Sequence, residues 1–333
     1  MKESDLRRSL RVLVAALVTL TGCERVFFPF PPLSPRIELL PQRLSEAGLY
    51  ADASLTTPAP DARPYTPRFE FWSDGATKRR WIRLPANASI DTTDMDDWEF
   101  PVGAELWKEF SHDGVRVETR LLLRETTQSD GWVAVSYVWN VEQTEAVVQP
   151  SGVENALGTP HDVPEARACM TCHGGRRHRV LGFSAIQLSA PSASGSDLTL
   201  DRLAREGLIS SAPSAPLKIP GNQTEVAALG YLHTNCGSCH NEKRPADAKY
   251  LAPPAGLDLW LQADALRELS ATPTLRTAIP KYIRPGRPEL SSLFKHVASP
   301  DWPWQEMPPI AVEVEDRRGV DTLYRWIEAM GPE

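Results

Sequence analysis

The sequence VRVETRLLLRE at residues 115–125 alternates apolar and charged side chains. The stretch GWVAVSYVWNV at residues 131–141 alternates in the same way with larger apolar side chains. A period of two residues is typical of a β-strand with one buried face. Shorter segments of similar character, RFEFW, KRRWIRLP and AELWKEF, are separated by the turn signals SDG and HDG. Residues 65–150 are therefore predicted to form a compact antiparallel β-rich domain.

The strand pattern fades after Pro150. Two low-complexity connectors, SAPSASGSD at residues 189–197 and SSAPSAPLKIPG at residues 210–221, isolate a last segment. This segment begins with NQTEVAALGYLHTN and ends with GVDTLYRWIEAMG, where apolar residues recur at helical spacing. We expect an α+β multidomain chain in which the β-rich part precedes a mainly α-helical region.

The first 22 residues have the pattern of a signal peptide. Four basic residues precede or flank the start of the apolar run VLVAALVTL, and LTGC follows at residues 20–23. Nine apolar residues are too few to span a bilayer. The LTGC string resembles the lipobox of bacterial lipoproteins. This resemblance predicts cleavage of residues 1–22 and lipidation of Cys23. We expect attachment to the periplasmic side of a membrane, with Glu24 at the second mature position favouring the outer membrane.

Residues 23–64 are rich in proline and are predicted to form a tether that then lies on the body of the protein. The chain has a formal net charge of −7, and removing the four basic and two acidic groups of residues 1–22 makes it −9. An acidic surface argues against nucleic-acid binding and against electrostatic binding to anionic lipid. Contact with the membrane is thus expected through the N-terminal lipid alone.

Four of the five cysteines fall in two Cys-x-x-Cys-His motifs. The motifs are CMTCH, with Cys169, Cys172 and His173, and CGSCH, with Cys236, Cys239 and His240. This is the attachment motif of haem c: the two thiols form thioethers with the haem vinyl groups, and the histidine binds the iron. The sequence predicts two covalent haem c groups. The first lies in a segment covering residues 151–221, and no cysteine remains for a structural disulfide.

The four motif cysteines have alternative uses. A four-cysteine zinc site would leave both histidines unexplained. A thioredoxin-like redox pair also uses Cys-x-x-Cys, but neither motif lies near a βαβ pattern. Plain disulfides are the remaining alternative.

Residues 222–333 resemble a class I cytochrome c domain: a helix, CGSCH, a long irregular segment, MPP at residues 307–309 and a terminal helix. The resemblance implies His240 as the proximal and Met307 as the distal iron ligand. The two prolines that follow Met307 also stiffen the loop that would carry its thioether to the iron, and a Met/His pair raises the reduction potential. Gly230 is a small residue at which the two terminal helices could approach closely.

From about Leu44 to the end, the chain also resembles an uncharacterised family of bacterial two-haem c-type cytochromes with a β-rich N-terminal part. The strings that carry this resemblance are FEFWSDGATKRRWI, DDWEFPVGAELWKEF, VETRLLLRE, YVWN, CMTCHGG and YLHTNCGSCHN. They imply a mainly α-helical cytochrome c region with two haem sites after the β-rich domain. The resemblance to this uncharacterised family does not indicate a biochemical role for the chain.

The sixth iron ligand of the first haem is left open by the sequence. No methionine follows His173 before Met307. The candidates are His161, eight residues before Cys169, and Met95 or His112 in the β-rich part; an open or water-filled position is the further alternative. His178 follows His173 too closely to reach round a macrocycle, and His233 is expected to pack locally.

Three functions are compatible with these features. The leading one is one-electron transfer between redox partner proteins, because haem performs this chemistry without further catalytic residues. The second is a peroxidase-like enzyme whose first haem has an open coordination site. The third is a redox-sensing or assembly subunit whose tryptophan-rich β segment binds a partner.

Overall fold

The computed structural model describes residues 35–128, 131–192, 195–245, 256–298, 307–309 and 311–331. Its central element is a six-stranded antiparallel sheet in the order β1-β2-β3-β4-β5-β6, so that each strand pairs with its neighbours in sequence. The strands are β1 (Arg63–Pro64), β2 (Thr77–Arg83), β3 (Glu105–His112), β4 (Val115–Arg124), β5 (Trp132–Trp139) and β6 (Ala146–Val148). The segments with two-residue periodicity provide the long central strands β4 and β5.

The α-helices are α1 (Cys169–His173), α2 (Leu200–Arg205), α3 (Gln223–Asn235), α4 (Pro273–Ala278), α5 (Ser292–Ala298) and α6 (Arg317–Ala329). Short 3-10 helices lie at Pro35–Leu39, Leu44–Glu46, Ala156–Gly158, Ala166–Ala168, Ala263–Ala265, Leu269–Ala271 and Pro288–Leu290. Within the described residues, no helix is both long and apolar enough to cross a membrane.

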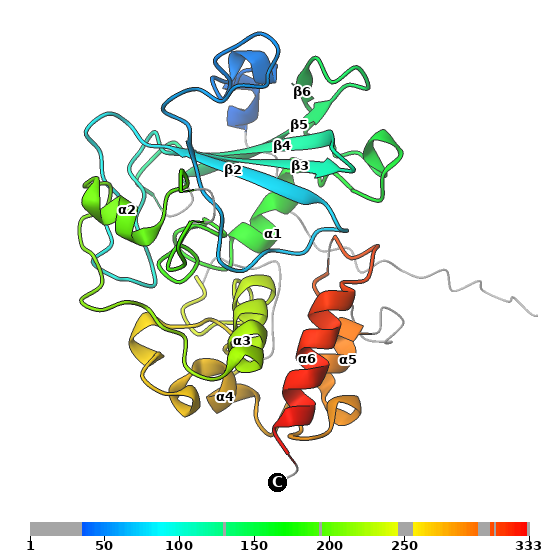
Figure 1. Cartoon of the computed structure of the whole chain (residues 1–333). Helices are drawn as coiled ribbons and strands as arrows, with labels where there is room; N and C mark the ends of the chain where they lie inside the picture. Colours follow the sequence, from blue (N-terminus) through cyan, green and yellow to red (C-terminus); the bar gives the residue numbers. More distant parts are fainter. Residues whose placement is uncertain are drawn as a thin grey trace, which may run out of the picture.

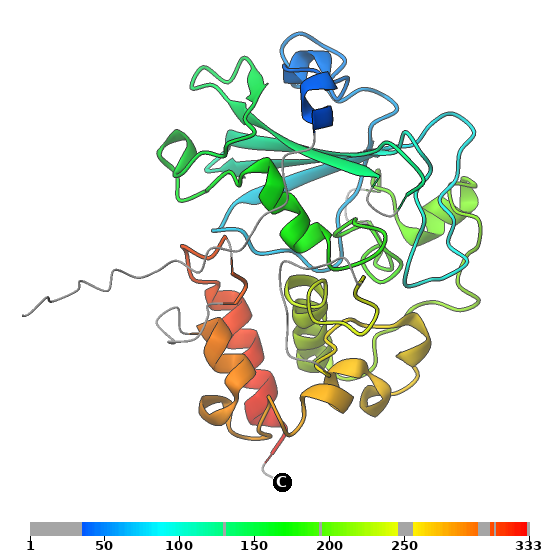
Figure 2. The same cartoon turned by 180° about the vertical axis from the view of Figure 1, so that it is seen from behind.

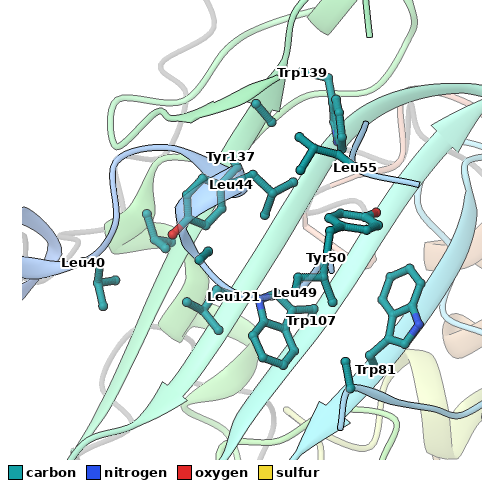
Figure 3. Packing of buried hydrophobic residues seen from close by; sticks show 14 of the residues in the cluster. Leu40, Leu44, Leu49, Tyr50, Leu55, Trp81, Trp107, Leu121, Tyr137 and Trp139 are labelled. Atoms are coloured by element: carbon teal, nitrogen blue, oxygen red, sulfur yellow. The ribbon is translucent and has the colours of Figure 1, made fainter. Parts of the chain in front are cut away.

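One face of the sheet is covered by the chain from residue 35 to residue 62 (Figure 1). The alternation of β2 to β5 turns their odd-numbered apolar residues to this face, among them Trp81, Trp107 and Tyr137. They pack against leucines of the covering segment, including Leu44 and Leu49 (Figure 3). The segment predicted to be a tether is therefore, from residue 35 onward, part of a hydrophobic core.

The opposite face of the sheet looks toward α1, which lies between the sheet and α3 to α6 (Figures 1 and 2). Even-numbered residues, such as Ile82, Leu106 and Leu122, point to this side. They form a second core with the loop at residues 90–104 and with the chain from residue 180 to residue 209. The sheet thus separates the N-terminal cover from the part of the chain that carries the cysteine motifs.

The predicted fold class is wrong, because the region after residue 150 is not mainly α-helical. Only α3 and α6 reach 13 residues, and the other helices of this region have 5 to 7. Between them the described chain is irregular, since prolines remove backbone donors and interrupt helices. The described residues also contain no group of three or more His, Cys, Asp or Glu side chains that could hold a metal ion. What the structure supports is a six-stranded antiparallel sheet with few helices.

Helices α3 and α6 pack side by side over a third core that contains Leu229, Leu232 and Trp326. The close approach is made by Gly319 of α6, where an added Cβ would lie 2.4 Å from the ring of Tyr231. Gly230, which we expected at this contact, instead faces the ring of Phe69, and a Cβ added there would lie 2.1 Å from that ring. The glycine that permits the helix crossing therefore lies on α6.

Candidate functional site

The first motif forms helix α1, which has 5 residues and directly follows the 3-10 helix Ala166–Ala168. The ring of His173 is partly buried, and its Nδ1 lies 2.5 Å from the carbonyl oxygen of Arg179. Burial, followed by the charge of Lys108, lowers the pKa of His173 to about 3, so the ring is neutral at pH 7. A neutral ring that donates from Nδ1 has its lone pair on Nε2, which is the arrangement of a metal-binding histidine.

The second motif follows α3 directly. The helix begins with a capping box in which Asn222 accepts from the Glu225 amide and Glu225 accepts from the Asn222 amide. After the helix, the amides of Cys239 and His240 donate to the carbonyl oxygen of Cys236 at 3.1 and 2.9 Å. The His240 Nδ1 is buried without a partner among the described residues, and burial lowers the pKa of this ring to about 4. His240 is thus also a neutral imidazole with an unused nitrogen.

The two motifs pack against each other although they are far apart in sequence. Gly175, two residues after His173, lies against the backbone of Ser238: an added Cβ would be only 1.8 Å from the Ser238 oxygen. The side-chain amide of Asn241 donates to the carbonyl oxygens of Gly175 at 3.2 Å and of Ser238 at 3.0 Å. The Sγ of Cys239 is 4.0 Å from the carbonyl oxygen of Thr171. The two cysteine pairs are therefore side by side in one site.

Arg176 fixes this junction from the other side. Its guanidinium is buried, donates to the carbonyl oxygen of Asp96 at 2.8 Å and to Asn241 Oδ1 at 3.3 Å, and lies 4.5 Å from the ring centre of Trp260. A planar cation that stacks on an aromatic ring and donates from its edge holds two loops in one geometry. The junction between the motifs is thus built by directional hydrogen bonds rather than by an apolar contact alone.

The four motif cysteines are free thiols. Burial raises the pKa of Cys169 to about 11, and burial raises the pKa values of Cys172 and Cys236 to about 12. Reactive cysteines of redox enzymes have lowered pKa values, so the thioredoxin-like alternative has no support. All four cysteines belong to the described residues, in which no metal-holding group of three or more ligands is found.

A cavity of about 130 Å³ lies between the sheet and the first motif. Cys169, Cys172 and His173 line it from α1, while Lys108 and Arg120 line it from β3 and β4. Aromatic rings of Phe71, Trp72 and Phe110 close further parts of the wall. An apolar wall that holds a few polar groups is typical of a cofactor site.

The candidates for the sixth iron ligand of the first haem lie in different parts of the structure. His161 is buried behind Phe110, with ring centroids 4.9 Å apart, and its Nε2 lies 2.8 Å from Glu118 Oε2. The His161 Nδ1 is buried without a partner among the described residues. His112 lies 5.8 Å from His161, ring centre to ring centre. Met95 packs against the second core and does not line the cavity.

Met307 lies next to α5, and its amide donates to the carbonyl oxygen of His296 at 3.2 Å. The charge of His296 acts on the pKa of His240, so this side of α5 is close to the second motif. Pro308, the next residue, lines the cavity of the first motif. The segment therefore reaches both motifs. Cys23 and the predicted signal peptide lie outside the described residues.

His178 and His233 are both buried, and each accepts a backbone hydrogen bond, from a neighbouring residue for His178 and from the distant Leu261 for His233. The Nδ1 of His178 accepts from the Val180 amide at 3.1 Å, and that of His233 accepts from the Leu261 amide at 3.0 Å. Sequence reasoning missed Lys108, Arg120, Arg176 and Asn241. The sequence shows basic residues at even-numbered positions of β3 and β4, which could have indicated Lys108 and Arg120. Their pairing depends on a strand register that the sequence does not specify.

Comparisons of the chain with known protein families, with curated proteins and with solved structures give no match. The function is therefore inferred from the geometry of the two motifs and from their chemistry.

Proposed function

We propose that this chain is an exported, lipid-anchored c-type cytochrome that carries two haem c groups and passes single electrons between redox partner proteins. The observation that carries the proposal is the packing of the two Cys-x-x-Cys-His motifs against each other at Gly175 and Ser238. Each motif offers two free thiols and a neutral histidine. These donors fit haem c, whereas a zinc site or a redox pair would leave the histidines without a use.

Haem supplies reversible one-electron chemistry when it is bound. The protein would contribute covalent attachment through Cys169 and Cys172 at the first motif and through Cys236 and Cys239 at the second. His173 would present Nε2 to the iron, because its Nδ1 is held by the Arg179 carbonyl. His240 and Met307 remain the proposed ligand pair of the second haem.

Side-by-side attachment supports a relay within one chain. Electron transfer between partners would enter at one haem and leave at the other, with Asn241 and Arg176 keeping the two attachment segments in contact. The location rests on residues 1–23: cleavage after Gly22 and lipidation of Cys23 would hold the protein on the periplasmic side of a membrane, with the outer membrane favoured. A Cys23→Ser variant should be released from membranes into the soluble fraction.

Stopped-flow mixing of the anaerobically reduced protein with an oxidised soluble cytochrome c tests the proposal. We expect two electrons to be delivered per chain. The paired variants Cys169→Ala/Cys172→Ala and Cys236→Ala/Cys239→Ala should deliver one each. A haem-loaded protein that delivers no electrons to such acceptors, or that consumes hydrogen peroxide catalytically instead, would overturn electron transfer as the function.

A further inference from the structure

A row of basic side chains crosses the sheet directly above the first motif. Arg80 of β2 pairs with Lys108 of β3, and Lys108 pairs with Arg120 of β4 in the strand register. Directly opposite side chains of neighbouring strands lie about 5 Å apart at Cβ. Like charges placed opposite each other destabilise a sheet. This arrangement is therefore costly unless an anion compensates it.

The described residues supply only one such anion. Glu118 accepts two hydrogen bonds from Arg120, at 2.7 and 2.8 Å. Neither Arg80 nor Lys108 forms an ion pair with any described residue, and the Nε and Nη2 of Arg80 are buried without partners there. The positive charge of Lys78 acts on Lys108 and adds to the repulsion. The negative charge of Glu70 acts on Arg80, but Glu70 is exposed to solvent. The buried Arg80 and the partly buried Lys108 thus lack a carboxylate partner among the residues that the structure describes.

Lys108 and Arg120 point into the cavity that the first motif lines. The Lys108 Nζ lies 5.3 Å from the ring centre of Phe71, which also lines the cavity. Arg120 remains 28% exposed although β4 is in the middle of the sheet, so its exposed part faces the cavity. Burial and the charges of Arg80 and Arg120 lower the pKa of Lys108 well below its ordinary value. A buried anion in the cavity would remove that penalty.

We infer that Lys108 and Arg120 bind the propionate carboxylates of the haem attached at Cys169 and Cys172, with Arg80 raising the positive potential behind them. This inference rests on the proposed function. A haem carries two carboxylates, and Lys108 and Arg120 are the two cations of the row that line the cavity. Lys108 has no carboxylate partner among the described residues, and Arg120, which pairs with Glu118, keeps a part of its side chain exposed. Charge-assisted hydrogen bonds between such groups are among the stronger ones in proteins. The sheet would therefore be the carboxylate-binding wall of the first haem site.

Two substitutions of Lys108 separate the effect of its charge from the effect of its size. Lys108→Met keeps the length of the side chain and removes the charge, whereas Lys108→Arg keeps the charge. Lys281→Met is the matched control, because Lys281 is exposed and does not line the cavity. Each variant is titrated potentiometrically with both haems in place, and haem is counted per chain as its pyridine haemochrome.

Loss of a cation beside a propionate favours the oxidised haem. In Lys108→Met we expect one of the two reduction waves to move to lower potential by about 59 mV, a tenfold fall in the ratio of reduced to oxidised haem. We expect Lys108→Arg and Lys281→Met to match the wild type. If Lys108→Met fails to load the first haem, Lys108→Arg should restore two haems per chain.

Two results would overturn the inference. One is an unchanged pair of waves in Lys108→Met. The other is a Lys108→Arg variant that behaves like Lys108→Met, since an effect that arginine cannot rescue would identify the lysine amine as an iron ligand or a packing group. A wild-type protein with fewer than two haems would instead defeat the proposed function, so the two failures are distinguishable.

Discussion

Gly175→Ala should separate the two cysteine motifs. The new Cβ would lie 1.8 Å from the Ser238 oxygen and 2.7 Å from the Ser238 carbonyl carbon, both of them backbone atoms that cannot rotate away. The two segments must move apart by more than 1 Å to restore a contact of 3.0 Å. Such a shift also stretches the Asn241 bond to the Gly175 carbonyl, which is already 3.2 Å long. Overpacking of a buried contact costs about 1–3 kcal/mol.

Thermal unfolding followed by circular dichroism measures this cost. The matched control is Gly207→Ala, because Gly207 has a φ of +69° with nothing within 4 Å of an added Cβ. That variant carries only the cost of a left-handed backbone, about 1–2 kcal/mol. Both variants should be less stable than the wild type, but only Gly175→Ala should change the magnetic interaction of the two haems in the EPR spectrum of the oxidised protein. A Gly175→Ala protein with wild-type stability and an unchanged spectrum would refute the contact.

Three further predictions concern single side chains. Glu118→Gln should destabilise the protein by about 3–5 kcal/mol at pH 7, since the fully buried Glu118 is the carboxylate partner of both Arg120 and His161. Burial alone would raise the pKa of Glu118, but Arg120 and His161 lower it to about 2. Glu118 should therefore stabilise the wild type above about pH 4.5, and this stabilisation should be lost as the pH falls toward 2. Denaturation midpoints measured across this range should show the loss in the wild type and not in Glu118→Gln. Burial raises the pKa of Asp96 to about 6, so its contribution should make the protein less stable as the pH rises from about 4 to about 6, and Asp96→Asn should abolish that dependence in the same assay. Met307→Ala should remove the low-spin Met/His EPR signal of the second haem, and an unchanged spectrum would exclude Met307 from the iron.

The strands could be predicted because their evidence is local. Alternation in residues 115–125 and 131–141 reports which side chains are buried, and β4 and β5 occupy those segments. The helical content was overestimated for the opposite reason. Helical spacing is present at α3 and α6, but it does not extend through the proline-rich chain between them.

The chemistry of the site could be predicted from the motifs, whereas its assembly could not. Cys-x-x-Cys-His specifies the donors within five residues. The contact between Gly175 and Ser238 and the register that aligns Arg80, Lys108 and Arg120 both depend on long-range packing. A lone basic residue on a strand indicates only a solvated side chain until its neighbours are known.

Haem attachment itself is the central claim, and counting haem tests it directly. The protein is expressed in a host that matures c-type cytochromes, denatured to remove non-covalent haem, and assayed as the pyridine haemochrome. We predict two covalently bound haems per chain, one in each of the variants Cys169→Ala/Cys172→Ala and Cys236→Ala/Cys239→Ala, and none when all four cysteines are replaced. A wild-type chain that retains no haem after denaturation, or that contains stoichiometric zinc in its place, would contradict the account.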